Sequence, residues 1–470
     1  MITSFGRWCQ GKASLAMNTM FCFKKINGLG KSAARLWLAM PLLGLSLVAG
    51  GAADAASGKV FNVRDFGATG NATTLDTKAI QRALDACGQA GGGTVLFPAG
   101  TYLSQPLTLR TKTTVLLEAG AMLLATTNQN DFMKAPGDWL KAGSSGDFNP
   151  FIGGKKLTDV TFTGSGTIDG NGAVWWGEAE KARQIKSGYT LPRPNLIVLE
   201  RCRNVRLENI TLQNSPKFHF VPSDCEDVVV SNVTILAPAH AANTDAIDPS
   251  GRRMLITRCR IDVGDDDVAI KAGRKIPGRD FQSEDITITD CTILHGHGIS
   301  IGSETLGGVR NVTVRNCTFE NTENGLRIKS QRGKGGVVEN IRYADITMKN
   351  VIPAITLTCY YMNNSAGDTT QPSTVKADDA RLANAMTPVF RNIYFRNVTA
   401  TCQKSAGVIT GLPESKISNV VFENVRISSV TGLTIKNADG VQFKNVQITT
   451  GQGPPVITNN AQIEGLAEAK

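Results

Sequence analysis

The chain has 470 residues, of which 41% are hydrophobic and 19% are charged. This balance is typical of a folded protein and argues against a disordered chain. Its 48 glycines and its aromatic share of only 6% indicate many tight turns and short strands. The formal net charge of +10 suits an acidic binding partner.

Residues 1 to 55 have the organisation of a secretory leader. Basic residues precede an apolar run from Leu36 to Gly50, and Ala53 and Ala55 fit the small-residue pattern expected before a cleavage site at Ala56. The apolar run is too short to span a bilayer comfortably, which disfavours the alternative of a membrane anchor. We therefore expect a processed, extracellular protein with one domain over residues 56–470.

A capped amphipathic helix is expected where this domain begins. In the stretch LDTKAIQRALDAC, Asp76 stands at the N-cap position, and Ile80, Leu84 and Cys87 share one face. The strands begin directly afterwards with GGGTVLFPAGTYL. The helix is expected to cover the open edge of the first strands, because an uncovered edge invites aggregation.

One short unit repeats through the middle and C-terminal parts of the chain. Segments such as LENITL, ITDCTI, VRNCTF and FENVRI place a small apolar residue or a cysteine at one position, at intervals of 21 to 32 residues and one of 52. Each unit holds short alternating strands, and such units bury an apolar face only by stacking. We predict an all-β fold, a single-stranded right-handed parallel β-helix with a short N-terminal capping helix. The polar stretch from Met362 to Met386 breaks the pattern and is expected to be a surface loop.

The cysteines follow the same repeat. Cys259, Cys291 and Cys317 stand in the apolar column and are expected to be buried free thiols. Cys202 and Cys225 share a different register, 23 residues apart, and the pattern leaves open a disulfide between neighbouring coils.

An asparagine recurs one position before the apolar column. Several of these residues also stand in N-x-T glycosylation signals, but a recurring turn position favours a ladder of side-chain amides across successive coils. The residues concerned are Asn209, Asn232, Asn316, Asn397, Asn424 and Asn445.

A second register carries unusual polar motifs. NTDAIDP, DDDVAIKAG, GHGISIGSE and NGLRIKS share isoleucines that are 23, 31 and 27 residues apart, which matches the coil lengths. Strands of adjacent coils lie about 4.8 Å apart, so equivalent positions become neighbours in space. Singly, each motif is more often a solvated turn, a polar strand face or a structural histidine, but their convergence indicates one site. We expect the outer surface to gather Asp245, Asp265, Asp266, His297, Arg327 and Lys329.

In this order the four motifs resemble the signature of the polygalacturonases, glycoside hydrolases of family 28 that act on pectin. The wider runs NSPKFHF and IGSETLGGVRNVTV are most similar to bacterial endo-polygalacturonases, and GSGTIDGNG fits as well. The resemblance extends from about Val60 to Val446. Asp267 departs from the cysteine or asparagine that is frequent in the family, and Ala246 departs from a common glycine. Neither change replaces a catalytic group.

The resemblance implies endo-acting hydrolysis of α-1,4-galacturonosyl linkages in de-esterified pectin, with inversion of configuration. Glycoside cleavage needs an acid that protonates the leaving oxygen and a carboxylate that activates water. By resemblance, Asp265 is the general acid, and Asp245 and Asp266 hold and deprotonate the water. His297 is expected to tune the acid or to contact the substrate. Crowded carboxylates do not all ionise easily, and the sequence does not decide which one keeps its proton.

Arg327 and Lys329 suit a uronic-acid polysaccharide, because a basic pair can bind the carboxylate that each sugar carries. The resemblance also assigns Asn243 to substrate binding and favours Tyr361 over its neighbour Tyr360 for a sugar contact. It implies homogalacturonan as the partner, and neither a metal nor another cofactor. Closed ends and independent coils make a monomer the default expectation.

Four other activities are compatible with parts of this pattern. An exo-acting polygalacturonase differs only in loops that close one end of the cleft, and a rhamnogalacturonan hydrolase has less need of the basic pair. A pectate lyase uses the same pectin lyase-like fold but commonly relies on Ca²⁺ and a basic residue. A non-catalytic adhesin would not require acid, base and basic pair in one place.

Overall fold

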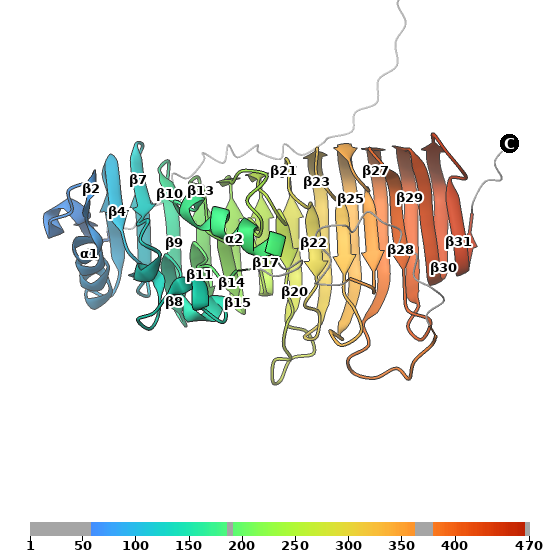
Figure 1. The fold of residues 1–470 in the computed structure, drawn as a ribbon, viewed down its shortest axis with the longest axis horizontal. Helices are drawn as coiled ribbons and strands as arrows, with labels where there is room; N and C mark the ends of the chain where they lie inside the picture. The colour runs from blue at the N-terminus through green and yellow to red at the C-terminus, as the bar shows by residue number, and fades with distance from the viewer. Residues whose placement is uncertain (1–57, 186–190, 362–378, 466–470) are drawn as a thin grey trace, which may run out of the picture. The chain divides into compact units, whose positions relative to one another are not determined.

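The computed structural model describes residues 58–185, 191–361 and 379–465, which belong to one compact unit. The predicted leader lies outside the described residues, as does the part of the predicted loop over residues 362–378, whereas residues 379–386 are exposed and form no strand. Strands dominate, and each pairs in parallel with the equivalent strand of the next coil (Figure 1). The predicted all-β, parallel β-helix fold is confirmed.

The strands form three columns, one for each side of a coil. The first column contains β1 (Val60–Asn62), β3 (Gly93–Phe97), β6 (Thr113–Leu117), β9 (Thr158–Gly164), β12 (Arg203–Glu208), β15 (Cys225–Ser231), β17 (Gly251–Thr257), β20 (Ser283–Thr289), β23 (Val309–Glu320), β25 (Val337–Val351), β27 (Val389–Cys402) and β29 (Ile417–Ser429). The second contains β2 (Asn71–Leu75), β4 (Gly100–Ser104), β7 (Ala121–Ala125), β10 (Thr167–Asp169), β13 (Thr211–Gln213), β16 (Thr234–Leu236), β18 (Arg260–Asp262) and β21 (Thr292–Ile293), and continues in the second halves of the long strands from β23 onward.

The third column carries the polar motifs. It contains β5 (Leu107–Thr108), β8 (Ile152–Lys155), β11 (Ile197–Glu200), β14 (Phe220–Ser223), β19 (Val268–Ile270), β22 (Ile299–Gly302), β24 (Leu326–Lys329), β26 (Ile355–Thr358) and β28 (Ser405–Thr410). Ile247 bridges β14 and β19. At the C-terminal end, β30 (Thr431–Thr450) pairs with both β28 and β29, and β31 (Val456–Glu464) pairs with β30.

The helix α1 (Thr77–Gln89) covers the first coil, as predicted. Ile80, Leu84 and Cys87 are buried on the face that packs against the strands. Asp76 is the N-cap residue of α1, as predicted, but its side chain makes no capping hydrogen bond to the helix. Its carboxylate instead accepts hydrogen bonds from the backbone N–H groups of Thr69 at 2.8 Å and Gly70 at 2.9 Å, and so fastens the preceding loop.

A second helix, α2 (Ala173–Ile185), was not anticipated from the sequence. Trp175 is fully buried, and the centroid of its ring lies 4.9–5.8 Å from those of Phe132, Trp139 and Phe148. These three residues belong to a loop that carries the 3-10 turns η2 (Gln129–Phe132), η3 (Trp139–Lys141) and η4 (Ser145–Asp147); a further turn, η1 (Val63–Phe66), lies beside α1. Among the described residues, no helix is long and apolar enough to cross a membrane.

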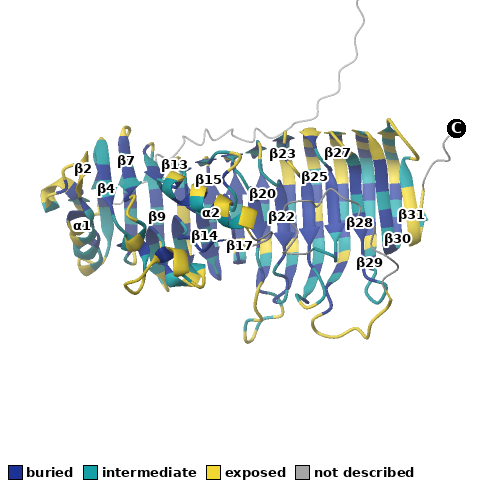
Figure 2. Cartoon of the chain, viewed as in Figure 1, coloured by how far each residue is buried: buried dark blue, intermediate teal, exposed yellow. Residues whose placement is uncertain are grey.

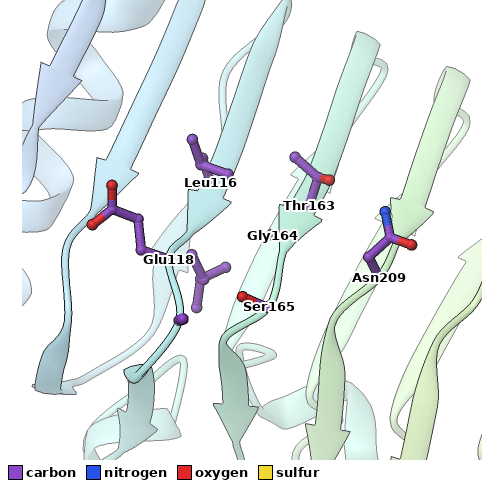
Figure 3. Close-up of a pocket in the computed structure, with 8 residues that line it drawn as sticks. Leu116, Glu118, Thr163, Gly164, Ser165 and Asn209 are labelled. Carbon is purple, nitrogen blue, oxygen red and sulfur yellow. The ribbon is translucent and has the colours of Figure 1, made fainter. Parts of the chain in front are cut away.

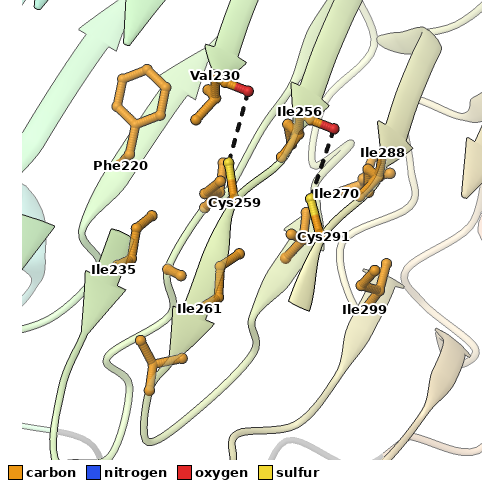
Figure 4. Packing of buried hydrophobic residues seen from close by; sticks show 14 of the residues in the cluster. Phe220, Val230, Ile235, Ile256, Cys259, Ile261, Ile270, Ile288, Cys291 and Ile299 are labelled. Carbon is orange, nitrogen blue, oxygen red and sulfur yellow. Dashed lines mark hydrogen bonds between the residues drawn. The ribbon is translucent and has the colours of Figure 1, made fainter. Parts of the chain in front are cut away.

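Buried residues recur at equivalent positions of successive strands (Figure 2). Cys259 and Cys291 occupy the predicted apolar column beside isoleucines and donate to backbone oxygens of the preceding coil (Figure 4). All eight cysteines of the described residues are free, so the disulfide considered for Cys202 and Cys225 does not form. The thiol of Cys225 donates to the backbone oxygen of Leu199 at 3.2 Å, and its sulfur accepts from the N–H of Cys202 at 3.4 Å. The thiol of Cys202 donates to the backbone oxygen of Glu200 at 3.5 Å, so both thiols are satisfied.

The asparagine ladder is present on the outside of the coils. The six predicted residues adopt left-handed backbone conformations with φ between 50° and 62°, which asparagine tolerates better than most residues. Asn232 donates to Asn209 at 2.8 Å, and Asn424 links Asn397 at 3.1 Å to Asn445 at 2.7 Å. The ladder joins successive coils where the chain turns.

Candidate active site

Asp245, Asp266 and His297 stand at equivalent positions of three successive coils. Each precedes by two residues a member of the inward-facing row formed by Ile247, Val268 and Ile299. Arg327 and Lys329 follow on β24 of the next coil, on either side of the inward Ile328. The structure therefore brings together the residues that the four motifs singled out.

Asp265 forms a close pair with His297. One carboxylate oxygen lies 3.0 Å from Nδ1 of the histidine, and the other accepts from the backbone N–H of Asn243 at 3.0 Å. Burial by itself raises the pKa of Asp265, but the charge and the hydrogen bond of His297 outweigh burial and lower that pKa below its usual range. Nε2 of His297 lies 3.0 Å from Glu323, a residue that the sequence analysis missed although it directly precedes the NGLRIKS motif.

Asp266 is held by cations. One of its oxygens accepts from Arg327 and from the hydroxyl of Ser300 at 2.9 Å, and the other accepts from Nζ of Lys329 at 2.7 Å. Burial opposes ionisation, but the charges of Arg327 and Lys329 lower the pKa of Asp266 well below its usual range. Ser300 also accepts from Nε of Arg327 at 2.9 Å; it was missed because the serine of GHGISIGSE carries no charge.

Asp245 has the opposite environment. Its nearest cation is Lys271, whose Nζ lies 3.9 Å from one carboxylate oxygen, and Lys271 is shared with Asp248 at 3.8 Å and Glu304 at 3.8 Å. Burial, together with the charges of Asp248 and Asp265, raises the pKa of Asp245 well above its usual value. Burial likewise raises the pKa of Asp248 to about 7. Lys271 and Asp248 lie within the quoted motifs but were not assigned a role.

Two buried side chains support the backbone of the first motif. Arg193 donates to the side-chain oxygen of Asn243 at 3.0 Å and to the backbone oxygen of Ala242 at 3.1 Å. A ring nitrogen of His219 lies 3.2 Å from the backbone oxygen of Asp245, and burial lowers the pKa of this histidine to about 4. His219 is therefore neutral near pH 7, and both side chains position Asn243 and Asp245.

Tyr360 and Tyr361, which follow β26 in the chain, differ in their surroundings. Nζ of Lys329 lies 5.0 Å from the ring centroid of Tyr361, whereas the ring of Tyr360 lies 5.9 Å from the guanidinium of Arg332. Tyr361 is thus the tyrosine that borders the carboxylate cluster.

One ligand atom from each of Asp265, Asp266 and His297 lies within 4.8 Å of the others, a spacing that a metal ion can bridge. The local charges oppose this use. The pKa of His297 is raised, although burial opposes this, by the charge and hydrogen bond of Asp265, and an imidazolium does not ligate a metal. Asp266 already has two cationic partners.

One described pocket lies elsewhere, on N-terminal coils between Glu118, Thr163, Ser165 and Asn209, and contains none of the predicted site residues (Figure 3). A second pocket is lined by Arg201, Arg203, Arg274 and Arg279, of which Arg203 and Arg279 pair with the buried Glu226. The pair of Arg203 and Glu226 belongs to a column of alternating charges that continues through Arg252, Glu284, Arg310 and Glu339. We assign this column to coil stacking.

Comparisons with known proteins agree with this geometry. The family model described as "Glycosyl hydrolases family 28" matches residues 87–464. An endo-polygalacturonase of Pectobacterium carotovorum subsp. carotovorum is 35% identical over 374 residues, which cover 77% of this chain and 86% of that protein. The crystal structure of the polygalacturonase from Erwinia carotovora ssp. carotovora superposes with a TM-score of 0.64 at 32% identity, covering 84% and 94% of the two chains. That of an exopolygalacturonase from Thermotoga maritima gives 0.70 at 26% identity, covering 84% and 93%. The chain therefore belongs to family 28 of the glycosyl hydrolases and is a glycoside hydrolase.

Proposed function

We propose that the protein hydrolyses α-1,4-galacturonosyl linkages of de-esterified pectin, that it acts within the polymer, and that it inverts the anomeric configuration. The observation that carries this proposal is the meeting of three carboxyl groups with unlike environments beside two cations. Asp245 favours its protonated form, whereas Asp265 and Asp266 favour ionised forms. Environments that push carboxyl pKa values apart supply acid and base within one site.

The family resemblance makes Asp265 the acid, but the charges around it leave it ionised in the free protein. We infer that His297, whose raised pKa keeps it protonated, holds this proton and delivers it to Asp265 through Nδ1, 3.0 Å away, as the charge that develops on the leaving oxygen draws the proton onward. Asp265 then passes this proton to the leaving oxygen. Asp266, which is ionised in the free protein, accepts a proton from the attacking water, and Asp245 holds that water by a hydrogen bond.

Binding of the sugar carboxylate is assigned to Arg327 and Lys329. Both are almost fully buried and contact Asp266, so a substrate carboxylate has to meet their remaining N–H groups from the outer side. Tyr361 covers Lys329 and is assigned to the same sugar, and Asn243 is assigned to the sugar next to Asp265. Since Asp266 and the substrate compete for the same two cations, binding and proton transfer are coupled at this point.

We further propose that residues 1–55 are a secretory leader, that residues 56–470 are the catalytic domain, and that the processed protein is an extracellular monomer. Relatives are named both endo-polygalacturonase and exopolygalacturonase. The endo assignment follows the Pectobacterium relative, which has the higher sequence identity.

Product analysis on de-esterified polygalacturonate, with a chelator present, tests the proposal. The intact protein should release mixed saturated oligogalacturonates, and NMR should detect the inverted anomer first. Asp265→Asn should abolish this activity, whereas the control Asp262→Asn, which changes a carboxylate that pairs with His295 at 2.7 Å, should retain it. Release of only mono- or digalacturonate would establish the exo alternative. An unsaturated product would refute hydrolysis.

A further inference from the structure

Lys217 is a cation at the edge of the carboxylate cluster that lacks a carboxylate partner. Within the part of the chain that the structure describes, no carboxylate oxygen lies within ion-pair distance of its Nζ. The ammonium group donates to the hydroxyl of Ser145 at 2.9 Å and lies 4.5 Å from the ring centroid of Phe218. Its side chain is half-buried. A desolvated ammonium without an anionic partner is costly, so this site favours an anion from outside the chain.

The position of Lys217 relates it to the catalytic residues. The backbone N–H of His219 donates to the backbone oxygen of Asp245 at 2.8 Å, so Lys217 precedes Asp245 by one coil. Arg327 and Lys329 stand two coils after Asp266. Lys217 and this basic pair therefore lie on opposite sides of the carboxylates along the axis of the coils. The backbones of Lys217 and Lys329 are four coils apart, which is about 19 Å at about 4.8 Å per coil. A polymer lying along the coils therefore meets these two cations with different sugars.

The neighbours of Lys217 suit a uronate unit. Phe218 is half-buried, and Nζ of Lys271 lies 5.8 Å from its ring centroid. An apolar ring flanked by ammonium groups offers a face to the carbons of a sugar and a charge to its carboxylate. Burial, together with the charge of Arg193, lowers the pKa of Lys217, which is consistent with an unmet need for a negative charge.

The position of the Lys217 ammonium depends on Ser145, which comes from a loop outside the repeating coils. It belongs to η4, within the loop that Trp175 of α2 fixes through its aromatic contacts. The hydroxyl group orients the ammonium of Lys217 without neutralising it.

We propose that Lys217, oriented by Ser145, binds the carboxylate of a galacturonate unit that lies over the coils on the N-terminal side of the carboxylate cluster. Lys217 thereby forms a second uronate subsite, across the cluster from Arg327 and Lys329. This inference rests on the proposed function, because it presumes a polygalacturonate chain in the site. It adds a residue that determines specificity for unesterified substrate.

The test compares Lys217→Met with the intact protein on polygalacturonate and on the same polymer after partial methyl esterification. Loss of a charged hydrogen bond should raise KM on polygalacturonate about 10-fold, and the rise should shrink as esterification increases, because a methyl ester offers no charge to Lys217. Ser145→Ala should give a smaller rise of the same kind. Lys349→Met, which removes an exposed lysine paired with Glu320 at 3.2 Å, serves as the matched control and should leave both KM values unchanged.

An unchanged KM for Lys217→Met on polygalacturonate would overturn the inference. So would an equal rise on both substrates, since that result indicates a structural role. Lys217→Gln provides a second variant in which a polar side chain keeps the contact with Ser145. If the intact protein fails to cleave polygalacturonate at all, the proposed function itself is wrong, and this outcome is separate from a failure of the Lys217 subsite alone.

Discussion

Asp267 is a buried carboxyl group whose ionisation should weaken the fold. It is 0% exposed, one oxygen accepts from the backbone N–H of Gly298 at 2.8 Å, and the other has no hydrogen-bond partner among the described residues. Burial raises the pKa of Asp267 well above its usual value. We predict that Asp267→Asn, which keeps the size and shape of the side chain, stabilises the protein near neutral pH.

The magnitude follows from proton linkage. Below about pH 4 the carboxyl is protonated in both the folded and the unfolded chain, so its ionisation costs nothing. Above the unfolded-state pKa of about 3.9, only the unfolded chain releases the proton, and the folded state of the native sequence loses about 1.4 kcal/mol per pH unit until the folded-state pKa is reached. The advantage of Asp267→Asn should therefore grow from near zero at pH 4 to as much as about 3 kcal/mol at pH 6.

Guanidinium denaturation of both proteins at pH 4, 5 and 6 measures this difference. The exposed Asp379 supplies the control variant Asp379→Asn, which makes the same substitution at a position that is not buried. If the free energies of unfolding of the native protein and of Asp267→Asn differ by the same amount at all three pH values, the argument is refuted. A variant that is less stable at pH 6 would do so as well.

Three further predictions concern the site and the stack. Asp266→Ala should destabilise the fold by about 3–5 kcal/mol, because it leaves two buried cations unpaired; urea denaturation measures this, and a loss below 1 kcal/mol would contradict it. His297→Gln should remove the proton source of Asp265, so the limb along which activity falls with rising pH, which follows the raised pKa of His297 in the intact protein, should move to lower pH; an unmoved limb would show that His297 does not supply the proton. Asn424→Ala should cost about 2–3 kcal/mol from the left-handed backbone and two lost amide hydrogen bonds. Asn424→Gly should cost less because glycine removes the strain, and equal midpoints in thermal unfolding for the two variants would speak against the contribution of the left-handed backbone.

The sequence by itself determined the coil and the composition of the carboxylate cluster. Both follow from periodicity, because a repeat that buries its apolar column by stacking must place equivalent positions side by side. Asp245, Asp266 and His297 could therefore be assigned to one patch although more than 50 residues separate the first from the last. The same reasoning predicted the asparagine ladder and the buried thiols at Cys259 and Cys291.

Only the tertiary structure decided which groups meet where the period is broken. Ser145 reaches Lys217 across 72 residues from a loop that interrupts the repeat, and α2, which supports that loop, lies in a segment without the strand pattern. Asp76 occupies the expected position before α1, yet its carboxylate turns to a neighbouring loop rather than to the helix.

The protonation pattern also required the structure. Asp265, Asp266 and Asp267 are consecutive in the sequence, but one lies against His297, one is held by Arg327 and Lys329, and one is enclosed by the backbone of the next coil. A carboxyl pKa depends on burial and on charges within a few ångströms. Those distances are set by side chains of other coils, so the motif predicts where the carboxylates lie, and the packing around them decides which ones ionise.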